Sequence, residues 1–365
     1  MLVMKTAVGA GLLLALAGAA WAQAPVVHPG GAITFSFAGP NVTQVSVTVD
    51  TLPAPLALTL GQNGVWSVTI PPLKPEIYAY HYTVDDINMA DPASMWTAPN
   101  LLYHASLVLI PGSAAGLPPQ PWEQTKVPHG AVEHYYYHSA VVGEERDYFV
   151  YTPPGYDPLA KRKYPVLYLL HGFSDDTRAW TEVGRANFIL DNLIAAGKAV
   201  PMIVVMPLGY GALEVITAKR PLAPELVARN YASFTQSLLT EVMPRIERDY
   251  RVAAGPKQTA IAGLSMGGAE GLYAGVSHPE KFGYVGAFSA AALDFTQTAL
   301  QWQAPRQLLW LSCGEQDELV GDNNRRLDGW LSEHKVPATV KWTRGRHIWA
   351  LWREDLVELA PLLFR

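Results

Sequence analysis

A serine between two glycines is the clearest chemical signal in this chain. In the stretch AGLSMGG, Gly263 and Gly267 each lie two residues from Ser265, and the apolar run TAIAGL leads into it. A tight turn from a buried strand into a helix lifts a serine hydroxyl off a sheet, and it needs glycines where side chains would collide. We therefore predict that Ser265 is a nucleophile; the alternative is an incidental serine in a glycine-rich turn.

A serine hydroxyl becomes a good nucleophile when a histidine takes its proton and a carboxylate holds that histidine in the right tautomer. Three histidines follow Ser265, and two of them, His278 and His334, lie in polar segments that are typical of solvent-facing positions. His347 follows the last expected strand, where a loop reaches the carboxyl edge of a parallel sheet. The spacing favours His347 as the base.

Asp317 is the aspartate best placed to orient this histidine, because it closely follows the apolar run QLLWLSCG. Other aspartates downstream of the serine include Asp294, Asp322 and Asp328. Asp322 and Glu315 remain alternatives, since one loop could present either neighbour, and each of these carboxylates could instead stabilise a helix N-terminus. Hydrolysis through an acyl-enzyme is the chemistry that a serine, a histidine and an aspartate perform together.

The negative oxygen formed in such a reaction needs two converging backbone amides. Met266, the residue after the serine, is expected to supply one of them. The second is expected from Phe173 in YPVLYLLHGFSDD, where a His-Gly turn follows an apolar run and Gly172 lets the backbone approach closely. His171 in the same turn is interpreted as an orienting residue rather than as a base.

These side chains need a sheet to position them, and the pattern from Tyr164 onward predicts one. Continuous apolar runs alternate with helical segments expected near residues 182–196, 231–250, 268–277, 323–335 and 350–362. Buried runs between helices are typical of a parallel sheet covered on both faces. Two strands before Tyr164 are expected to pair antiparallel. The sequence predicts an α/β domain over residues 131–365 with a doubly wound, mostly parallel sheet.

The earlier part of the chain has a different pattern. Residues 24–112 carry short alternating runs broken by Gly, Pro and Asn-Gly turns, which predicts a small all-β sandwich. The Pro-, Gly- and Ala-rich stretch over 113–130 is expected to be a linker or a chain laid over a surface. Residues 1–22 predict a signal peptide cleaved after Ala22, and hence a secreted or periplasmic protein. A membrane anchor is the alternative, but the apolar stretch is shorter than the roughly 20 residues that a spanning helix needs.

Composition limits the classes of partner and cofactor. The 365 residues carry a net charge of -5 and no run of Lys or Arg longer than the three residues 161–163. A nucleic-acid partner is therefore not expected, and a small neutral or acidic ligand is expected instead. Cys313 is the only cysteine, and its apolar surroundings predict a buried strand residue rather than a catalytic thiol. His134 and His138 in HYYYH lie in a strand-like stretch, so a zinc site is not expected there.

Five stretches carry a resemblance to a known family: LYLLHGFSDDTRAW, PMIVVMP, AGLSMGGAEGLYAGVSHPEKFGYVGAFSA, LSCGEQDEL and GRHIWALWREDL. In this order they resemble the esterase D family of α/β-hydrolases, and the likeness runs from about His134 to the C-terminus. The family includes feruloyl and acetylxylan esterases, siderophore trilactone esterases, S-formylglutathione hydrolase and mycolyltransferases. The resemblance places the family's nucleophile, acid and histidine on Ser265, Asp317 and His347.

The N-terminal region is similar to early-set immunoglobulin-like domains through GVWSVTIPPLKPEIYAYHYTVDD. Some related modules bind glucan. Here the aromatic residues Trp66, Tyr78, Tyr80 and Tyr82 alternate along the expected strands, so they could equally pack the sandwich. We expect the region to cover part of the α/β domain and shape the rim of its cleft.

The resemblance implies a serine carboxylesterase without metal or other cofactor, which acts on a small-molecule or polysaccharide-linked ester. The favoured hypothesis is a feruloyl or acetylxylan-type esterase on plant cell-wall polysaccharide. An esterase for siderophore trilactones or general aryl esters is the alternative, and a non-catalytic carbohydrate-binding protein is a third. Trp180, Trp349 and Trp352 could stack on an aromatic acyl group or belong to the core. The segment 209–225 is expected to hang over the cleft.

Overall fold

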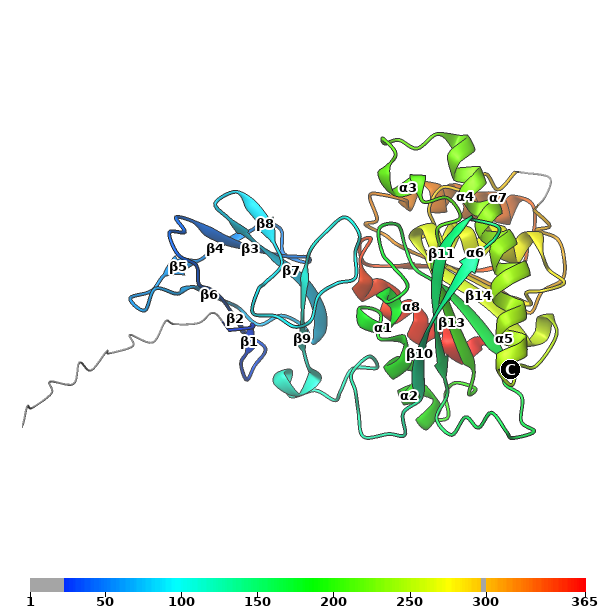
Figure 1. Ribbon diagram of the computed structural model, residues 1–365, viewed down its shortest axis with the longest axis horizontal. Coiled ribbons are helices and arrows are strands. Elements are labelled where there is room, and N and C mark those ends of the chain that lie inside the picture. The colour runs from blue at the N-terminus through cyan, green and yellow to red at the C-terminus, as the bar shows by residue number, and fades with distance from the viewer. Residues whose placement is uncertain (1–22, 297–299) are drawn as a thin grey trace, which may run out of the picture.

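The computed structural model describes residues 23–296 and 300–365, so the predicted signal peptide over 1–22 lies outside the described residues. An all-β region ends at Ile110, and a larger α/β region begins at Ala131 (Figure 1). Across the described ranges, every helix is too short or too polar to cross a bilayer.

Two sheets enclose the core of the N-terminal region. One has the strand order β1-β2-β6-β5, and the other has the order β4-β3-β7-β8 with β9 paired to β7. The strands are β1 (Val26–Val27), β2 (Ile33–Phe37), β3 (Val45–Val49), β4 (Leu56–Ala57), β5 (Thr59–Leu60), β6 (Trp66–Ile70), β7 (Glu76–Val84), β8 (Ile87–Met89) and β9 (Ser106–Ile110). Along β2 and β3, every second side chain is buried, as expected for strands with one face on a core.

The aromatic residues of this region belong mainly to its core. Tyr78, Tyr80 and Tyr82 on β7 are all buried, and Trp66 packs partly buried against the same cluster. The Tyr80 ring lies 5.1 Å from that of Phe35 on the facing sheet. The packing interpretation of these side chains therefore describes their positions better than a glucan-binding one.

The segment between the two regions is laid over the surface and fixed there. It begins with a 3-10 turn at Gly112–Ala115 and carries two buried side chains, Trp122 and Glu123. Glu123 Oε1 accepts hydrogen bonds from the amides of Gly112 and Gln120 at 2.8 and 2.7 Å. The Asn192 side chain donates to two carbonyls of the segment. These contacts make it a packed connection rather than a flexible one.

The α/β region is built on an eight-stranded sheet with the order β10-β11-β13-β12-β14-β15-β16-β17. Its strands are β10 (Ala131–Ser139), β11 (Glu144–Thr152), β12 (Val166–Leu170), β13 (Ile203–Pro207), β14 (Thr259–Leu264), β15 (Tyr284–Phe288), β16 (Leu308–Gly314) and β17 (Thr339–Thr343). The pairs β10-β11 and β11-β13 are antiparallel, and every pair from β13 to β17 is parallel. Strands β12 to β15 are wholly buried, which explains their continuous apolar sequences.

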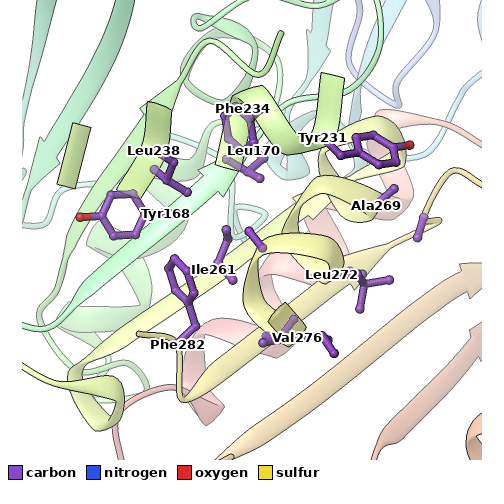
Figure 2. Close-up of a cluster of buried hydrophobic side chains, with 14 of the residues drawn as sticks. Tyr168, Leu170, Tyr231, Phe234, Leu238, Ile261, Ala269, Leu272, Val276 and Phe282 are labelled. Carbon is purple, nitrogen blue, oxygen red and sulfur yellow. The ribbon is translucent and has the colours of Figure 1, made fainter. Parts of the chain in front are cut away.

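Helices cover both faces of this sheet, and the sheet separates two hydrophobic cores. They are α1 (Ala179–Glu182), α2 (Ala186–Ala195), α3 (Glu214–Thr217), α4 (Pro224–Ser237), α5 (Met243–Asp249), α6 (Ser265–Ser277), α7 (Gly321–Glu333) and α8 (Trp349–Leu359). Figure 2 shows side chains of β12 and β14 meeting those of α4 and α6 in the first core. The arrangement fits the α/β-hydrolase-like fold that the resemblance implies.

Three expected helix starts were wrong. The helix expected from residue 231 begins at Pro224, whose fixed φ suits the first turn, and a π-helical turn at Leu238–Val242 joins it to α5. The helix expected from residue 268 begins at Ser265 itself. The helix expected near 182–196 is α2, which begins only at residue 186; residue 182 ends the separate helix α1, and Arg185 lies between the two at φ 56°.

The two regions pack directly against each other. Arg353 on α8 is fully buried, and its Nε donates to Glu76 Oε1 on β7 at 3.0 Å, while Nη2 lies 2.8 Å from the same oxygen as an ion pair. The same guanidinium donates to the carbonyls of Ile77 and Val183. Ile77 and Leu107 of the N-terminal region are members of the core that α2 and α8 cover. The N-terminal region is therefore anchored to the helix that follows His347.

Candidate active site

Ser265 stands at the junction of β14 and α6 in a strained backbone conformation. Its φ is 51°, in the left-handed region that a residue with a side chain rarely adopts. A Cβ on Gly263 would lie 2.5 Å from the Gly267 carbonyl oxygen, and one on Gly267 would lie 2.4 Å from the His171 carbonyl oxygen. Both glycines are needed, although the collisions they avoid are with backbone rather than between their own side chains.

Three side chains form a hydrogen-bonded chain at the carboxyl edge of the sheet. Ser265 Oγ lies 3.0 Å from His347 Nε2, and His347 Nδ1 lies 2.8 Å from Asp317 Oδ2. Asp317 follows β16 and is buried, and its second oxygen accepts from the amides of Leu319 and Val320. The structure thus brings together the three residues that sequence reasoning selected.

The electrostatics of Asp317 fix the tautomer of the histidine. Burial by itself would raise the pKa of this carboxyl, but the hydrogen bond and charge of His347, with the Val320 amide, outweigh it and hold the pKa below its ordinary value. An ionised carboxylate only accepts hydrogen bonds, so Nδ1 of His347 carries the proton. Nε2 is then left with a lone pair facing the Ser265 hydroxyl.

The alternative residues lie away from this chain of contacts. Asp322 is exposed in the first turn of α7, and Glu315 is exposed in the loop before it. His278 pairs with Glu280 beyond the end of α6, and the ring of His334 stacks on Trp330 after α7. None of these four contacts Ser265 or His347 through a hydrogen bond in the described residues.

Phe173 and Met266 line one cavity together with Ser265, as an oxyanion site requires. Met266 is in the first turn of α6, where helical amides have no partner within the helix. Phe173 comes directly after Gly172 in the loop that follows β12. A Cβ on Gly172 would lie 2.5 Å from Leu264 Cδ1. The roles of these two amides remain a prediction.

His171 holds the loop that carries Phe173. It is buried, and its Nδ1 donates to the Gly172 carbonyl at 2.8 Å while Nε2 accepts from the Gly209 amide at 2.9 Å. Burial lowers the pKa of His171 to about 4, so the ring is neutral near pH 7 and can make both bonds at once. It ties the loop after β12 to the loop after β13.

The larger cavity at the site has a volume of about 440 Å³ and mostly apolar walls. The segment 209–225 contributes Val215, Arg220 and Leu222 to it, as expected for a segment over the cleft. The guanidinium of Arg220 lies 3.8 Å from the centre of the Phe173 ring. A flat apolar group next to Ser265 would therefore be enclosed by hydrocarbon and aromatic side chains.

One of the three tryptophans expected to contact the substrate, Trp180, lies in the core instead. Trp180 is buried, its Nε1 donates to the Leu170 carbonyl at 2.9 Å, and it lines neither cavity that reaches Ser265. Its ring packs edge-to-face against the ring of Trp349, with 5.1 Å between the two ring centres. Trp349 and Trp352 do line a second, smaller cavity beside Ser265 and His347.

Two buried acids near the site were missed from the sequence. Asp175 lies two residues after Phe173, and burial raises its pKa to about 8. Glu270 is fully buried on α6, where burial raises its pKa well above the ordinary value, and it accepts from Asn230 at 2.8 Å. Only the position of Asp175 in HGFSDD, beside the oxyanion loop, offered a signal in the sequence.

Cys313 and the two histidines of HYYYH each have contacts with neighbouring protein groups. Cys313 is buried in β16, and burial raises the pKa of its thiol to about 12. His134 contacts Asp147 and His138 contacts Glu145 along β10 and β11. Within the part of the chain that the structure describes, no three metal-binding side chains gather at one place.

Comparison with known sequences identifies the family and several relatives. The sequence profile of a family described as "Putative esterase" matches residues 139–363. An endo-1,4-beta-xylanase/feruloyl esterase of Xylanibacter ruminicola is 28% identical over 358 residues, which cover 93% of this chain and 46% of that protein. An esterase of Mycobacterium tuberculosis is 31% identical over 135 residues, or 37% of this chain and 27% of that protein. The chain spans less than half the length of these curated relatives.

Two solved structures are similar over most of their own length. A ferulic acid esterase of the anaerobic fungus Anaeromyces mucronatus is 27% identical with a TM-score of 0.58, covering 66% of this chain and 93% of that one. The enterobactin esterase of Shigella flexneri is 17% identical with a TM-score of 0.64, covering 90% of this chain and 92% of that one. At that lower identity, the second likeness shows the fold alone.

Proposed function

This chain belongs to the family described as "Putative esterase", and we propose that it is a serine carboxylesterase that works through an acyl-enzyme on Ser265. The observation that carries the proposal is the hydrogen-bonded chain from Asp317 through His347 to Ser265, with distances of 2.8 and 3.0 Å. Three side chains from three separate loops meet in the order that activates a serine hydroxyl.

In the proposed reaction, Ser265 Oγ attacks the ester carbonyl carbon while its proton moves to His347 Nε2. The amides of Phe173 and Met266 stabilise the negative oxygen, and Asp317 stabilises the imidazolium. When the bond between the carbonyl carbon and the alcohol oxygen breaks, His347 returns the proton to the leaving alcohol. Water, deprotonated by the same histidine, then releases the acid and restores Ser265.

We propose a feruloyl-type ester as substrate, with an acetylxylan-type ester as a close variant. The apolar cavity of about 440 Å³ suits an aromatic acyl group, and one curated relative and one solved relative are described as feruloyl or ferulic acid esterases. The fungal relative was also solved with ferulic acid bound. These similarities support an aromatic acid as the acyl part.

A siderophore trilactone or a simple aryl ester is the second candidate. The Shigella flexneri enzyme with the same fold was solved in the presence of enterobactin, and the same three side chains would serve such a substrate. A carbohydrate-binding protein that has lost catalysis is disfavoured, because Ser265, His347 and Asp317 are all in contact.

The proposal extends to the rest of the chain. We place it in the esterase D branch of α/β-hydrolases and interpret the two-sheet region before Ile110 as an immunoglobulin-like domain. Residues 1–22 would act as a signal peptide that sends the protein to the periplasm or the medium.

Hydrolysis of three esters tests the substrate. We expect kcat/KM for methyl ferulate to exceed the values for a catecholate trilactone and for p-nitrophenyl acetate. A higher value for the trilactone would move the assignment to the second candidate. If neither natural-type ester is hydrolysed faster than p-nitrophenyl acetate, the feruloyl assignment is wrong while the esterase assignment stands.

A further inference from the structure

A second cavity, of about 280 Å³, lies where the two regions of the chain meet and reaches both Ser265 and His347. The N-terminal region supplies Asp50 and Ala79 to its wall, and the α/β region supplies Trp349 and Trp352. The active serine is therefore reached from two sides, and one of these sides exists only because the N-terminal region is docked.

Besides Ser265 and His347, this second cavity is lined by three polar side chains, those of Asp50, Asn100 and Asp175. Asp50 follows β3 and is exposed to the cavity, although protein surrounds it on most sides and raises its pKa to about 6. Asn100 bridges to the α/β region by donating to Ser174 Oγ at 2.8 Å and to Asp175 Oδ1 at 3.1 Å. With a pKa raised to about 8 by burial, Asp175 is protonated near pH 7 and can donate a hydrogen bond.

The two cavities differ in chemistry as the two parts of an ester do. The larger one is lined mainly by aliphatic and aromatic side chains, and the smaller one combines two tryptophans with three polar side chains in addition to Ser265 and His347. A ligand with C–H faces and several hydroxyl groups matches this second combination, because indole rings cover its faces while carboxyl and amide groups bind its hydroxyls.

The residues that follow the histidine favour one of the two cavities for the alcohol. His347 must protonate the leaving oxygen, so the alcohol has to lie beside it. His347 lines both cavities, but Ile348, Trp349 and Trp352, which follow it in the chain, line only the smaller one. The larger cavity contains Met266, whose amide would face the carbonyl oxygen.

The wall of the smaller cavity is fixed by buried contacts. Arg353 lies one residue after Trp352 on α8, and its guanidinium holds Glu76 and the Ile77 carbonyl of the N-terminal region. Trp349 is supported by Trp180 and by Trp352, whose ring centre is 5.5 Å away. Side chains held in place in this way can recognise the shape of a bound group in addition to shielding it from water.

We propose that the cavity between the two regions binds the alcohol part of the ester, that this part is a sugar residue, and that Asp50 determines the preference for it. The proposal rests on the esterase function proposed above. It assigns to the N-terminal region a direct part in substrate selection.

Two ferulic esters that differ only in the alcohol test this proposal. For the wild-type full chain, kcat/KM should be higher for feruloyl arabinose than for methyl ferulate. Asp50→Ala should lower the ratio of these two values about tenfold, the loss expected for a hydrogen bond to a charged group. Asp50→Asn, which keeps the side-chain shape, should lower the ratio less.

Asp86→Asn is the matched control, since Asp86 is exposed on the same region with a left-handed backbone that asparagine tolerates, and it does not line this cavity. It should leave both kcat/KM values as in the wild type. Equal wild-type values for the two esters, or an unchanged ratio in both Asp50 variants, would overturn the sugar subsite. Absence of hydrolysis of every ester by the wild type would instead overturn the proposed function, and the subsite with it.

Discussion

At the scale of single residues, the two carboxylate oxygens of Asp317 accept hydrogen bonds from different partners. Oδ1 accepts from the amides of Leu319 and Val320, and Oδ2 is left for His347 Nδ1. An asparagine would keep the shape but could present its NH₂ group to Nδ1, which would favour the wrong tautomer of the ring. We therefore expect the charge of Asp317, and not only its position, to be needed for hydrolysis.

Replacing Asp317 by asparagine should lower kcat on an ester such as methyl ferulate about 10³- to 10⁴-fold. Asp322→Asn is the matched control, because Asp322 is exposed in the first turn of α7 and should have little effect. Steady-state kinetics on both purified variants give the comparison. A larger loss for Asp322→Asn than for Asp317→Asn would move the acid to Asp322.

Residue types and spacing predicted which three side chains come together, because each follows an apolar strand and the ends of parallel strands share one edge. They did not predict which tryptophans line a cavity. Trp180 is buried under Trp349, while Trp349 and Trp352 reach a cavity. Asp175 was missed because its neighbour Asn100 is 75 residues away and belongs to the other region.

At the scale of elements, the turn from β14 into α6 is the strained feature of the fold. Ser265 has a φ of 51°, and the helix begins at this residue rather than after it. The packing of Gly267 against the His171 carbonyl brings α6 close to the loop that carries Phe173. One glycine therefore sets the distance between the two expected oxyanion amides.

Gly267→Ala should cost about 3 kcal/mol or more of unfolding free energy and most of the activity, because its Cβ would overlap backbone atoms that have no room to move. Gly271→Ala on the same helix is the control. Its Cβ would have no neighbour closer than 3.6 Å, so better helix propensity should make it neutral or up to about 1 kcal/mol more stable. Denaturant unfolding of both variants measures the difference, and equal stabilities would contradict the close approach.

The order of elements could be predicted from the alternation of apolar runs and helical segments, whereas several boundaries could not. The start of α4 at Pro224 falls in a segment without a clear apolar period, because its side chains face a cavity and solvent rather than a continuous core. The start of α6 at Ser265 was obscured by glycines, which are poor helix formers but are required by close packing here.

At the scale of the whole molecule, the two regions share a buried ion pair. Arg353 on α8 is fully buried and donates to Glu76 on β7, and removing one partner would leave an uncompensated charge in the interior. The contact joins positions 277 residues apart, so sequence pattern alone could not predict it. Because α8 follows His347, this contact also supports the site.

Glu76→Ala should lower the free energy of unfolding by about 3 kcal/mol or more. Glu358→Ala is the control. Glu358 lies on α8, as Arg353 does, and forms a more exposed ion pair with Lys341 on β17, so its loss should cost less than about 1 kcal/mol. Chemical denaturation followed by tryptophan fluorescence measures both. Equal and small effects would mean that the two regions do not depend on this pair.

Hydrolysis of p-nitrophenyl acetate by the wild type and by Ser265→Ala shows whether Ser265 forms the proposed acyl-enzyme. With both proteins shown to be folded by their melting temperatures, we expect the wild type to hydrolyse the ester and the variant to lose about 10³-fold or more of kcat. Equal rates for the two proteins would contradict the proposed acyl-enzyme.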